Sequence, residues 1–113
     1  MDLTVDDINP HTKCIRLNGR LDHKGSGAIE LRFTALTASN ADAAAIDMAG
    51  VDFIASIGMR LLLSCAKAKA GRGGRMVLFG LQPLVLEAMQ SAGIDTLIGI
   101  HADQPSALAA LST

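Results

Sequence analysis

The chain of 113 residues contains no tryptophan, no tyrosine and only three phenylalanines, so aromatic side chains are scarce. Proteins that bind single-stranded nucleic acid stack the bases on aromatic side chains, so this class of partner is not expected. The ten basic residues are balanced by eleven acidic ones, and the net charge of −1 provides no basic surface for a duplex. We therefore expect no direct contact with nucleic acid.

Long hydrophobic runs are also missing, since no apolar stretch approaches the ~20 residues that a membrane span requires. The apolar segment 57–66 is interrupted by Arg60, and the acidic N-terminus lacks the layout of a signal peptide. Cysteine is rare: Cys14 and Cys65 lie far apart, each among apolar residues, which predicts two buried free thiols in a reducing compartment. Together these features predict a cytoplasmic protein without membrane insertion.

Half of the residues are hydrophobic, which is enough for one packed core and one domain spanning residues 1–113. Alternating apolar and polar side chains predict two strands joined by a turn at Asn9–His11, and helical and strand-like patterns alternate after them. The predicted elements are strands over 3–8 and 13–18, a helix over 25–38, a strand over 43–48, a turn over 49–52, a helix over 57–70, a strand over 75–80, a helix that starts at Pro83 and is closed by Gly93, a strand over 96–100 and a helix over 105–111.

This order predicts an α/β fold that opens with a β-hairpin and continues with alternating strands and helices. Right-handed crossovers place the later strands parallel, which gives a mixed, mostly parallel sheet of four to five strands with about four helices. The glycine-rich segment 71–74 follows a helix and precedes a strand, so it is interpreted as a helix stop rather than a phosphate-binding loop.

Residues that could carry out chemistry are few. The three histidines are not spaced with other ligands as a metal site requires, and neither a Gly-x-Ser-x-Gly elbow nor a Walker loop occurs. Three aspartates lie at predicted strand ends, where ligand sites of parallel sheets gather. We expect Asp47 to hold down the loop that follows it, Asp52 to be a turn residue and Asp22, in a loop, to be the best functional candidate. No catalytic residue, cofactor or metal is expected.

Ser56 is the most informative residue, because it lies where a buried strand gives way to a helix. A serine at this position caps the helix in many proteins, and substituting such a cap by alanine typically costs ~1 kcal/mol. The same position places a hydroxyl at the positive end of the helix dipole, where a phosphoryl group is electrostatically tolerated. Both interpretations, a plain cap and a phosphorylation switch, follow from these residues.

Four segments of the sequence resemble the STAS domain, the fold of the bacterial anti-sigma factor antagonists. They occur in the family's order at fitting spacing and together represent nearly the whole chain. The segments are Leu17–Asp22, Ala45–Met59, Gly73–Leu78 and Met89–Asp95. The resemblance implies a STAS-like domain over residues 1–113 that is the substrate of enzymes and not an enzyme itself.

In this family the segment before the helix usually reads Asp-Ser-Ser/Thr-Gly-Leu, and a partner kinase phosphorylates the first hydroxyl residue. Ser56, two positions before Gly58, matches that residue, so the resemblance implies phosphorylation at Ser56. Two neighbours depart from the pattern, since Ala55 replaces the aspartate and Ile57 replaces the second hydroxyl residue. Asp22 matches the acid of the family's Gly-x-Leu-Asp loop, which lies near the phosphorylation site.

By the same resemblance, the protein is an anti-sigma factor antagonist that acts as a partner switch. Its unphosphorylated form binds an anti-sigma factor that is also a serine protein kinase, phosphorylation releases it, and a PP2C-type phosphatase resets it. The implied partner-binding residues are Asp22, His23, Ala55, Ser56, Ile57, Gly58 and Met59.

Two alternatives remain open at this stage. One is an unphosphorylated STAS interaction subunit of another bacterial assembly, for example in lipid transport, with Ser56 only a helix cap. The other is a small enzyme or ligand-binding domain, which the empty search for reactive residues disfavours.

Overall fold

The computed structural model describes residues 1–112 as an α/β domain built on a five-stranded sheet. The strand order is β1-β2-β3-β4-β5, with β1 antiparallel to β2 and each later neighbouring pair parallel. The strands are β1 (Asp2–Asn9), β2 (Thr12–Leu21), β3 (Ala43–Ile54), β4 (Met76–Phe79) and β5 (Gly99–His101). This architecture confirms the fold class that the sequence predicts.

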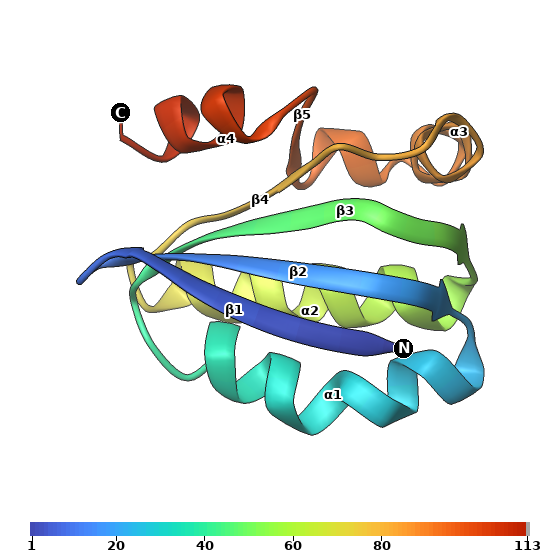
Figure 1. The fold of residues 1–113 in the computed structure, drawn as a ribbon, viewed down its shortest axis with the longest axis horizontal. Helices are drawn as coiled ribbons and strands as arrows, with labels where there is room; N and C mark the ends of the chain where they lie inside the picture. Colours follow the sequence, from blue (N-terminus) through green and yellow to red (C-terminus); the bar gives the residue numbers. More distant parts are fainter. Residues whose placement is uncertain (113) are drawn as a thin grey trace.

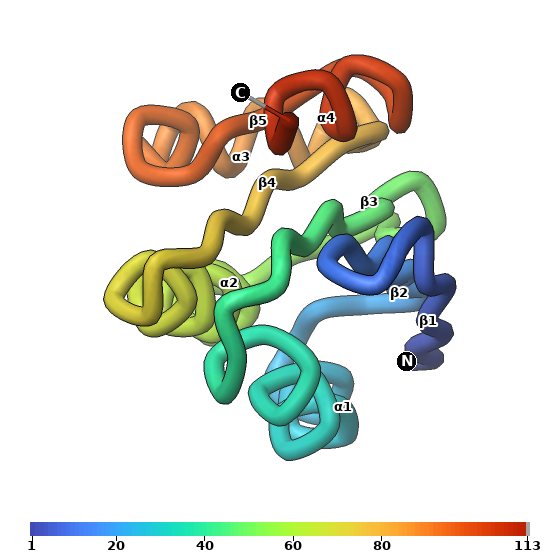
Figure 2. The backbone as a smooth tube through the Cα atoms, turned by 90° about the vertical axis from the view of Figure 1, so that its left-hand side faces the viewer, coloured from blue at the N-terminus to red at the C-terminus, as the bar shows by residue number. Residues whose placement is uncertain are grey.

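Helices cover both faces of the sheet, with α1 and α2 on one face and α3 and α4 on the other (Figures 1 and 2). The helices are α1 (His23–Thr37), α2 (Ser56–Gly71), α3 (Pro83–Ser91), the 3₁₀ helix η1 (Ile94–Thr96) and α4 (Gln104–Leu111). Since α1 and α2 each connect the end of one parallel strand to the start of the next, the two helices run parallel to each other.

The main hydrophobic core lies between the sheet and the α1–α2 layer. On β2 the alternate residues Ile15, Leu17 and Leu21 are buried in it, and Phe33 of α1 and Leu62 of α2 pack in the same cluster. A second, smaller cluster lies on the opposite face of the sheet, beneath α4. Its buried members are Cys14, Ala45, Val77, Phe79 and Ala107. Both cysteines are buried, as predicted.

β3 is one strand from Ala43 to Ile54, so the predicted turn over 49–52 is wrong. Its pairing with β2 shifts register twice within residues 47–53, and each shift adds one residue to β3. Extra residues of this kind are β-bulges, which bend a strand without ending it. The small and polar residues that signal a turn in the sequence therefore form bulges in the structure.

Asp47 and Asp52, which were expected to precede and to form that turn, both lie inside β3. Asp47 does hold down the backbone that follows it, since its Oδ1 accepts a hydrogen bond from Ala49 N at 3.0 Å. Its Oδ2 also accepts a hydrogen bond from Arg16 Nε of β2 at 3.1 Å. Asp52 is exposed at the second register shift. Both carboxylates belong to the sheet and not to a loop.

α1 begins at His23, earlier than the predicted start at Gly25. In the structure Gly25 has a packing role. A Cβ atom at Gly25 would lie 1.8 Å from the carbonyl oxygen of Arg20, so only glycine lets the helix start this close to β2.

The C-terminal elements differ slightly from prediction. Thr96 belongs to η1, and β5 occupies only Gly99–His101, so the predicted strand over 96–100 is shorter and shifted. α4 begins at Gln104, with Asp103 as its N-cap, whose Oδ1 accepts a hydrogen bond from Ser106 N at 3.0 Å.

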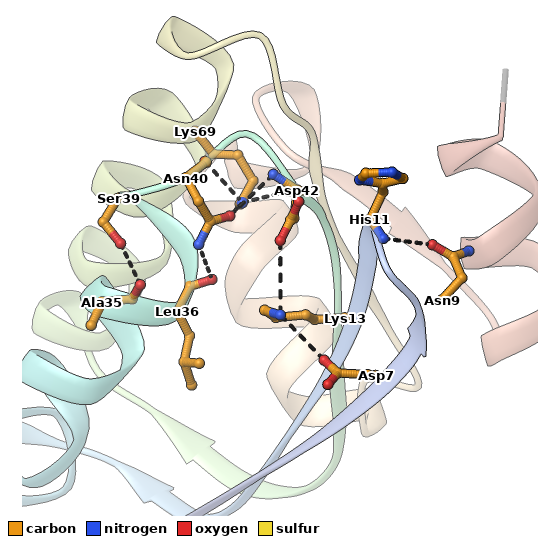
Figure 3. A network of polar contacts seen from close by, with 10 residues as sticks. All are labelled: Asp7, Asn9, His11, Lys13, Ala35, Leu36, Ser39, Asn40, Asp42 and Lys69. Atoms are coloured by element: carbon orange, nitrogen blue, oxygen red, sulfur yellow. Dashed lines mark hydrogen bonds and ion pairs between the residues drawn. The ribbon is translucent and has the colours of Figure 1, made fainter.

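Lys69, near the end of α2, is fully buried at 0% exposure. Its ammonium group is satisfied by the segment that joins α1 to β3 (Figure 3). Nζ donates to Asn40 O at 3.3 Å, to Asn40 Oδ1 at 3.0 Å and to the carbonyl oxygen of Asp42. Burial lowers the pKa of Lys69, an effect that the charge of Asp42 partly offsets. This network anchors the C-terminal end of α2 to the α1–β3 connection.

Substitution of Lys69 by methionine should therefore destabilise the protein. The variant leaves partly buried acceptors of Asn40 and Asp42 without the lysine donor, which costs about 1–3 kcal/mol. Because the folded pKa of Lys69 lies below its ordinary value of 10.5, the unfolded state binds more protons, and the wild type should gain stability relative to the variant as pH rises toward that value. Urea unfolding at several pH values measures both effects.

Lys67→Met is the matched control, because Lys67 lies one half-turn away on the exposed side of α2. It should change the free energy of unfolding by less than about 0.5 kcal/mol. Equal losses in the two variants would contradict a specific role for the buried ammonium group.

Candidate functional site

The predicted site residues come from two segments that the fold brings together. Leu21, the last residue of β2, pairs with Ile54, the last residue of β3. The backbone N–H of Ala55 then donates to Leu21 O at 3.0 Å. Since α1 follows β2 and α2 follows β3 almost at once, both helices begin at the same edge of the sheet (Figure 1).

Gly58 makes this arrangement possible. It is buried in the first turn of α2, and a Cβ atom there would lie 2.7 Å from Leu21 O and 2.9 Å from Leu21 Cβ. Any side chain at this position would force the helix away from the end of β2. Gly58 therefore sets the position of the residues around it, and as a buried glycine it contributes no side chain to a docking surface.

Ser56 is the first residue of α2, and Ala55 occupies the N-cap position with φ −102° and ψ 170°. No side chain caps this helix, so the interpretation of Ser56 as the helix cap is wrong. The helix starts one residue earlier than a serine cap requires. The Ser56 side chain is exposed, and its hydroxyl has no hydrogen-bond partner in the part of the chain that the structure describes. It lies at the positive end of the dipole of a 16-residue helix.

Asp22, the other main candidate, has a structural role. It is the N-cap of α1, and its Oδ1 accepts a hydrogen bond from Gly25 N at 2.8 Å. That hydrogen bond lowers the pKa of Asp22, and the nearby guanidinium of Arg20, whose Nε lies 3.5 Å from Oδ2, acts in the same direction. His23 follows as the exposed first residue of α1.

Arg20 and Phe53 belong to this edge, and sequence reasoning did not identify them. They are register partners on β2 and β3, and the Arg20 guanidinium lies 4.2 Å from the centre of the Phe53 ring, a cation–π geometry. Phe53 remains 38% exposed. Phe53 is noticeable in the sequence because the chain has few aromatic residues. Its pairing with Arg20, however, depends on the β-bulges of β3, which the sequence does not reveal.

A groove of ≈ 490 Å³ lies between α1 and α2, and its lining on α2 begins at Ile57, the residue after Ser56. Ile57, Leu61 and Cys65 of α2 line one side, and Glu30 and Thr34 of α1 line the other. Thr34 Oγ1 lies 3.8 Å from Cys65 Sγ, which shows how closely the helices approach at its floor. The helix that carries Ser56 therefore presents a partly apolar groove, while the partly buried Met59 packs against the core.

Within residues 1–112 no group of three or more histidine, cysteine, aspartate or glutamate side chains could hold a metal ion. In the same residues no helix is long and apolar enough to cross a membrane.

The fold and the site thus define a small α/β domain whose candidate site is an exposed surface at strand ends. A family model described as "Mlab, STAS domain" matches residues 4–99. The chain therefore belongs to the STAS-domain family, as its sequence motifs indicate.

Solved structures share this fold over nearly the whole chain. An anti-sigma factor antagonist from Mycobacterium paratuberculosis is 20% identical, with a TM-score of 0.87 over 99% of this chain and 94% of that one. SpoIIAA, a Bacillus anti-sigma factor antagonist in its unphosphorylated form, is 22% identical, with a TM-score of 0.78 over 95% and 93%. The murine anion transporter Slc26a9 is 15% identical, with a TM-score of 0.78 over 90% of this chain and 18% of the transporter. At these identities the similarity establishes the fold.

The capping role of Asp22 can be tested with Asp22→Asn, since asparagine caps helices about as well as aspartate but does not titrate. The folded pKa of Asp22 is below its ordinary value of 3.8. The charged carboxylate therefore stabilises the fold fully at pH values above 3.8, and this stabilisation is lost as pH falls through the folded pKa. Between about pH 5 and pH 2 the wild type should lose more stability than the variant.

Chemical unfolding across this pH range provides the measurement. Asp52→Asn is the control, because Asp52 is an exposed acid on the same edge that forms no hydrogen bond or ion pair within residues 1–112. An identical acid response of the Asp22 variant and the wild type would rule out the charged cap.

Proposed function

We propose that the protein is an anti-sigma factor antagonist that works as a phospho-regulated partner switch at Ser56. The observation that carries the proposal is the exposed, unbonded hydroxyl of Ser56 at the start of α2. A kinase can reach this hydroxyl without breaking a native hydrogen bond. The partner surface comprises Asp22, His23, Ala55, Ser56, Ile57, Gly58 and Met59, with Gly58 acting through the backbone.

In this proposal the protein is a substrate and the partner is the enzyme. An anti-sigma factor with serine kinase activity transfers the γ-phosphoryl group of ATP to Ser56. The bond between Ser56 Oγ and phosphorus forms, the bond from that phosphorus to the β-phosphate oxygen breaks, ADP leaves, and the serine proton is released. A PP2C-type phosphatase hydrolyses the phosphoserine and restores the hydroxyl. The proposal includes a cytoplasmic location, where partners of this kind work.

Electrostatics explains how one modification can change binding without unfolding the domain. A phosphoryl group adds about −1.5 to −2 charge at pH 7. At the N-terminus of α2 this charge is favourable to the helix dipole, so the fold of α2 is retained. The same charge, with its hydration shell, lies on the surface that a docked partner must cover, and it disfavours the complex. The solved structure of SpoIIAA in its phosphorylated form, which shares this fold, supports the proposal of such a modification here.

An unmodified interaction subunit is the second candidate. The observations in its favour are the match to the model described as "Mlab, STAS domain" and the replacement of the usual aspartate and second hydroxyl by Ala55 and Ile57. Because Ser56 does not cap α2, its part in this alternative would be that of an ordinary surface contact.

Intact mass after incubation with a candidate kinase and ATP separates the two functions. The wild type should gain the mass of one phosphoryl group, and Ser56→Ala should gain none. Ser64→Ala, which removes another exposed serine of α2, should still be modified. An unmodified wild type in the presence of an active cognate kinase rejects the switch and leaves the interaction subunit.

Substitutions of Ser56 should have little effect on folding. The side chain is exposed and unbonded, so Ser56→Ala and Ser56→Asp should each change the free energy of unfolding by less than about 0.5 kcal/mol. Ser56→Asp should nevertheless weaken binding to the partner, because it adds charge to the docking surface. Thermal and urea unfolding measure stability, and a loss of several kcal/mol would contradict the exposed position of Ser56.

A further inference from the structure

Arg60 stands four residues after Ser56 on α2. Side chains at positions i and i+4 lie next to each other on a helix surface, and this spacing supports ion pairs between opposite charges. The negative residue comes first in the pair and the positive one second, which is also the order that the helix dipole favours.

The guanidinium of Arg60 is available for such a pair. Arg60 is exposed, and within residues 1–112 no carboxylate lies within ion-pair distance of it and no hydrogen bond involves its side chain. Arg20, the other arginine near this edge, already contacts Asp22 and the Phe53 ring. Arg60 is thus the uncommitted arginine beside the proposed phosphorylation site.

The chain supplies no competing acid on the same helix. Residues 53–86 contain five basic side chains and no aspartate or glutamate. An acid on α1 faces the same groove as Arg60, since Glu30 lines its opposite side. Other charged or titratable groups near the starts of α1 and α2 are Asp22, His23 and Lys24 of the α1 start and Asp52 near the end of β3.

We propose that Arg60 is the intramolecular partner of a phosphoryl group on Ser56, a role that rests on the proposed function. A guanidinium donates two parallel hydrogen bonds to phosphate oxygens, which makes arginine well suited to this contact. In the unmodified protein Arg60 is a free positive charge on the docking surface, available to a carboxylate of the partner. After phosphorylation it turns to the phosphoryl group and is withdrawn from the partner. Modification then adds a negative charge and removes a positive one at the same place.

The test uses phosphoserine inserted at position 56 during translation, so it needs no kinase. Phosphorus NMR titration gives the second pKa of the phosphoserine, which is ordinarily about 6. Because Arg60 stabilises the dianion, Arg60→Gln should raise this pKa by about 0.3 unit or more. Arg60→Lys, which keeps the charge but lacks the planar fork, should raise it by less. Equal values in wild type and Arg60→Gln would overturn the proposal.

Lys67→Gln is the matched control, because it removes one exposed, unpaired positive charge from the same helix at a position two turns farther from Ser56. Its effect on the phosphoserine pKa should be less than about 0.1 unit at 0.1 M salt, where charges a Debye length apart are screened. An effect as large as that of Arg60→Gln would show that the phosphoserine pKa responds to any positive charge on α2. That result would also overturn the pairing with Arg60.

The outcome is independent of whether a kinase exists. If the pKa shift is present but no kinase modifies Ser56, the pairing is correct and the switch is wrong. If a kinase modifies Ser56 but the shift is absent, the switch is correct and Arg60 has no part in it. Thermal unfolding of each variant verifies that the titrated proteins are folded.

Discussion

The candidate site depends on the close contact between the start of α2 and the end of β2. The hydrogen bond from Ala55 N to Leu21 O and the missing side chain at Gly58 let the two backbones approach. Because α1 starts directly after β2, the same contact brings the beginnings of both helices to one edge. Gly25 has the same role on α1, where the absence of a side chain lets the helix lie against the carbonyl group of Arg20. Two glycines therefore define the surface on which Ser56 is displayed.

Much of this could be predicted from the sequence, since the necessary information is local. The hairpin, the alternation of strands and helices, and the junction before Ser56 each follow from a few neighbouring residues. The bulges of β3 could not be predicted, because small and polar residues fit a turn and a bulge equally well. The contact between Arg20 and Phe53 depends on those bulges, and the cap position at Ala55 depends on a shift of one residue. Register across strands and helix starts are set by packing, which a single sequence does not show.

The two departures from the family pattern acquire a structural meaning. Ala55 leaves α2 without a side-chain cap, whereas an aspartate at that position would be able to accept hydrogen bonds from the first-turn amides. Ile57 adds an apolar wall to the groove between α1 and α2. Compared with the family pattern, the two residues beside Ser56 are uncharged and more hydrophobic. A partner that docks on the proposed surface would therefore meet an apolar groove rather than a row of hydroxyls.

The two ends of α2 differ in how firmly side chains hold them. The ammonium group of the buried Lys69 holds the C-terminal part of the helix to the connection between α1 and β3, while the first turn has no capping side chain. A helix anchored in this way cannot slide along its axis without breaking hydrogen bonds to a buried cation. A modification at the first turn would therefore have to break these hydrogen bonds in order to move α2 along its axis. In the proposed switch, a partner that distinguishes the two states of Ser56 would therefore contact the first turn of α2 itself.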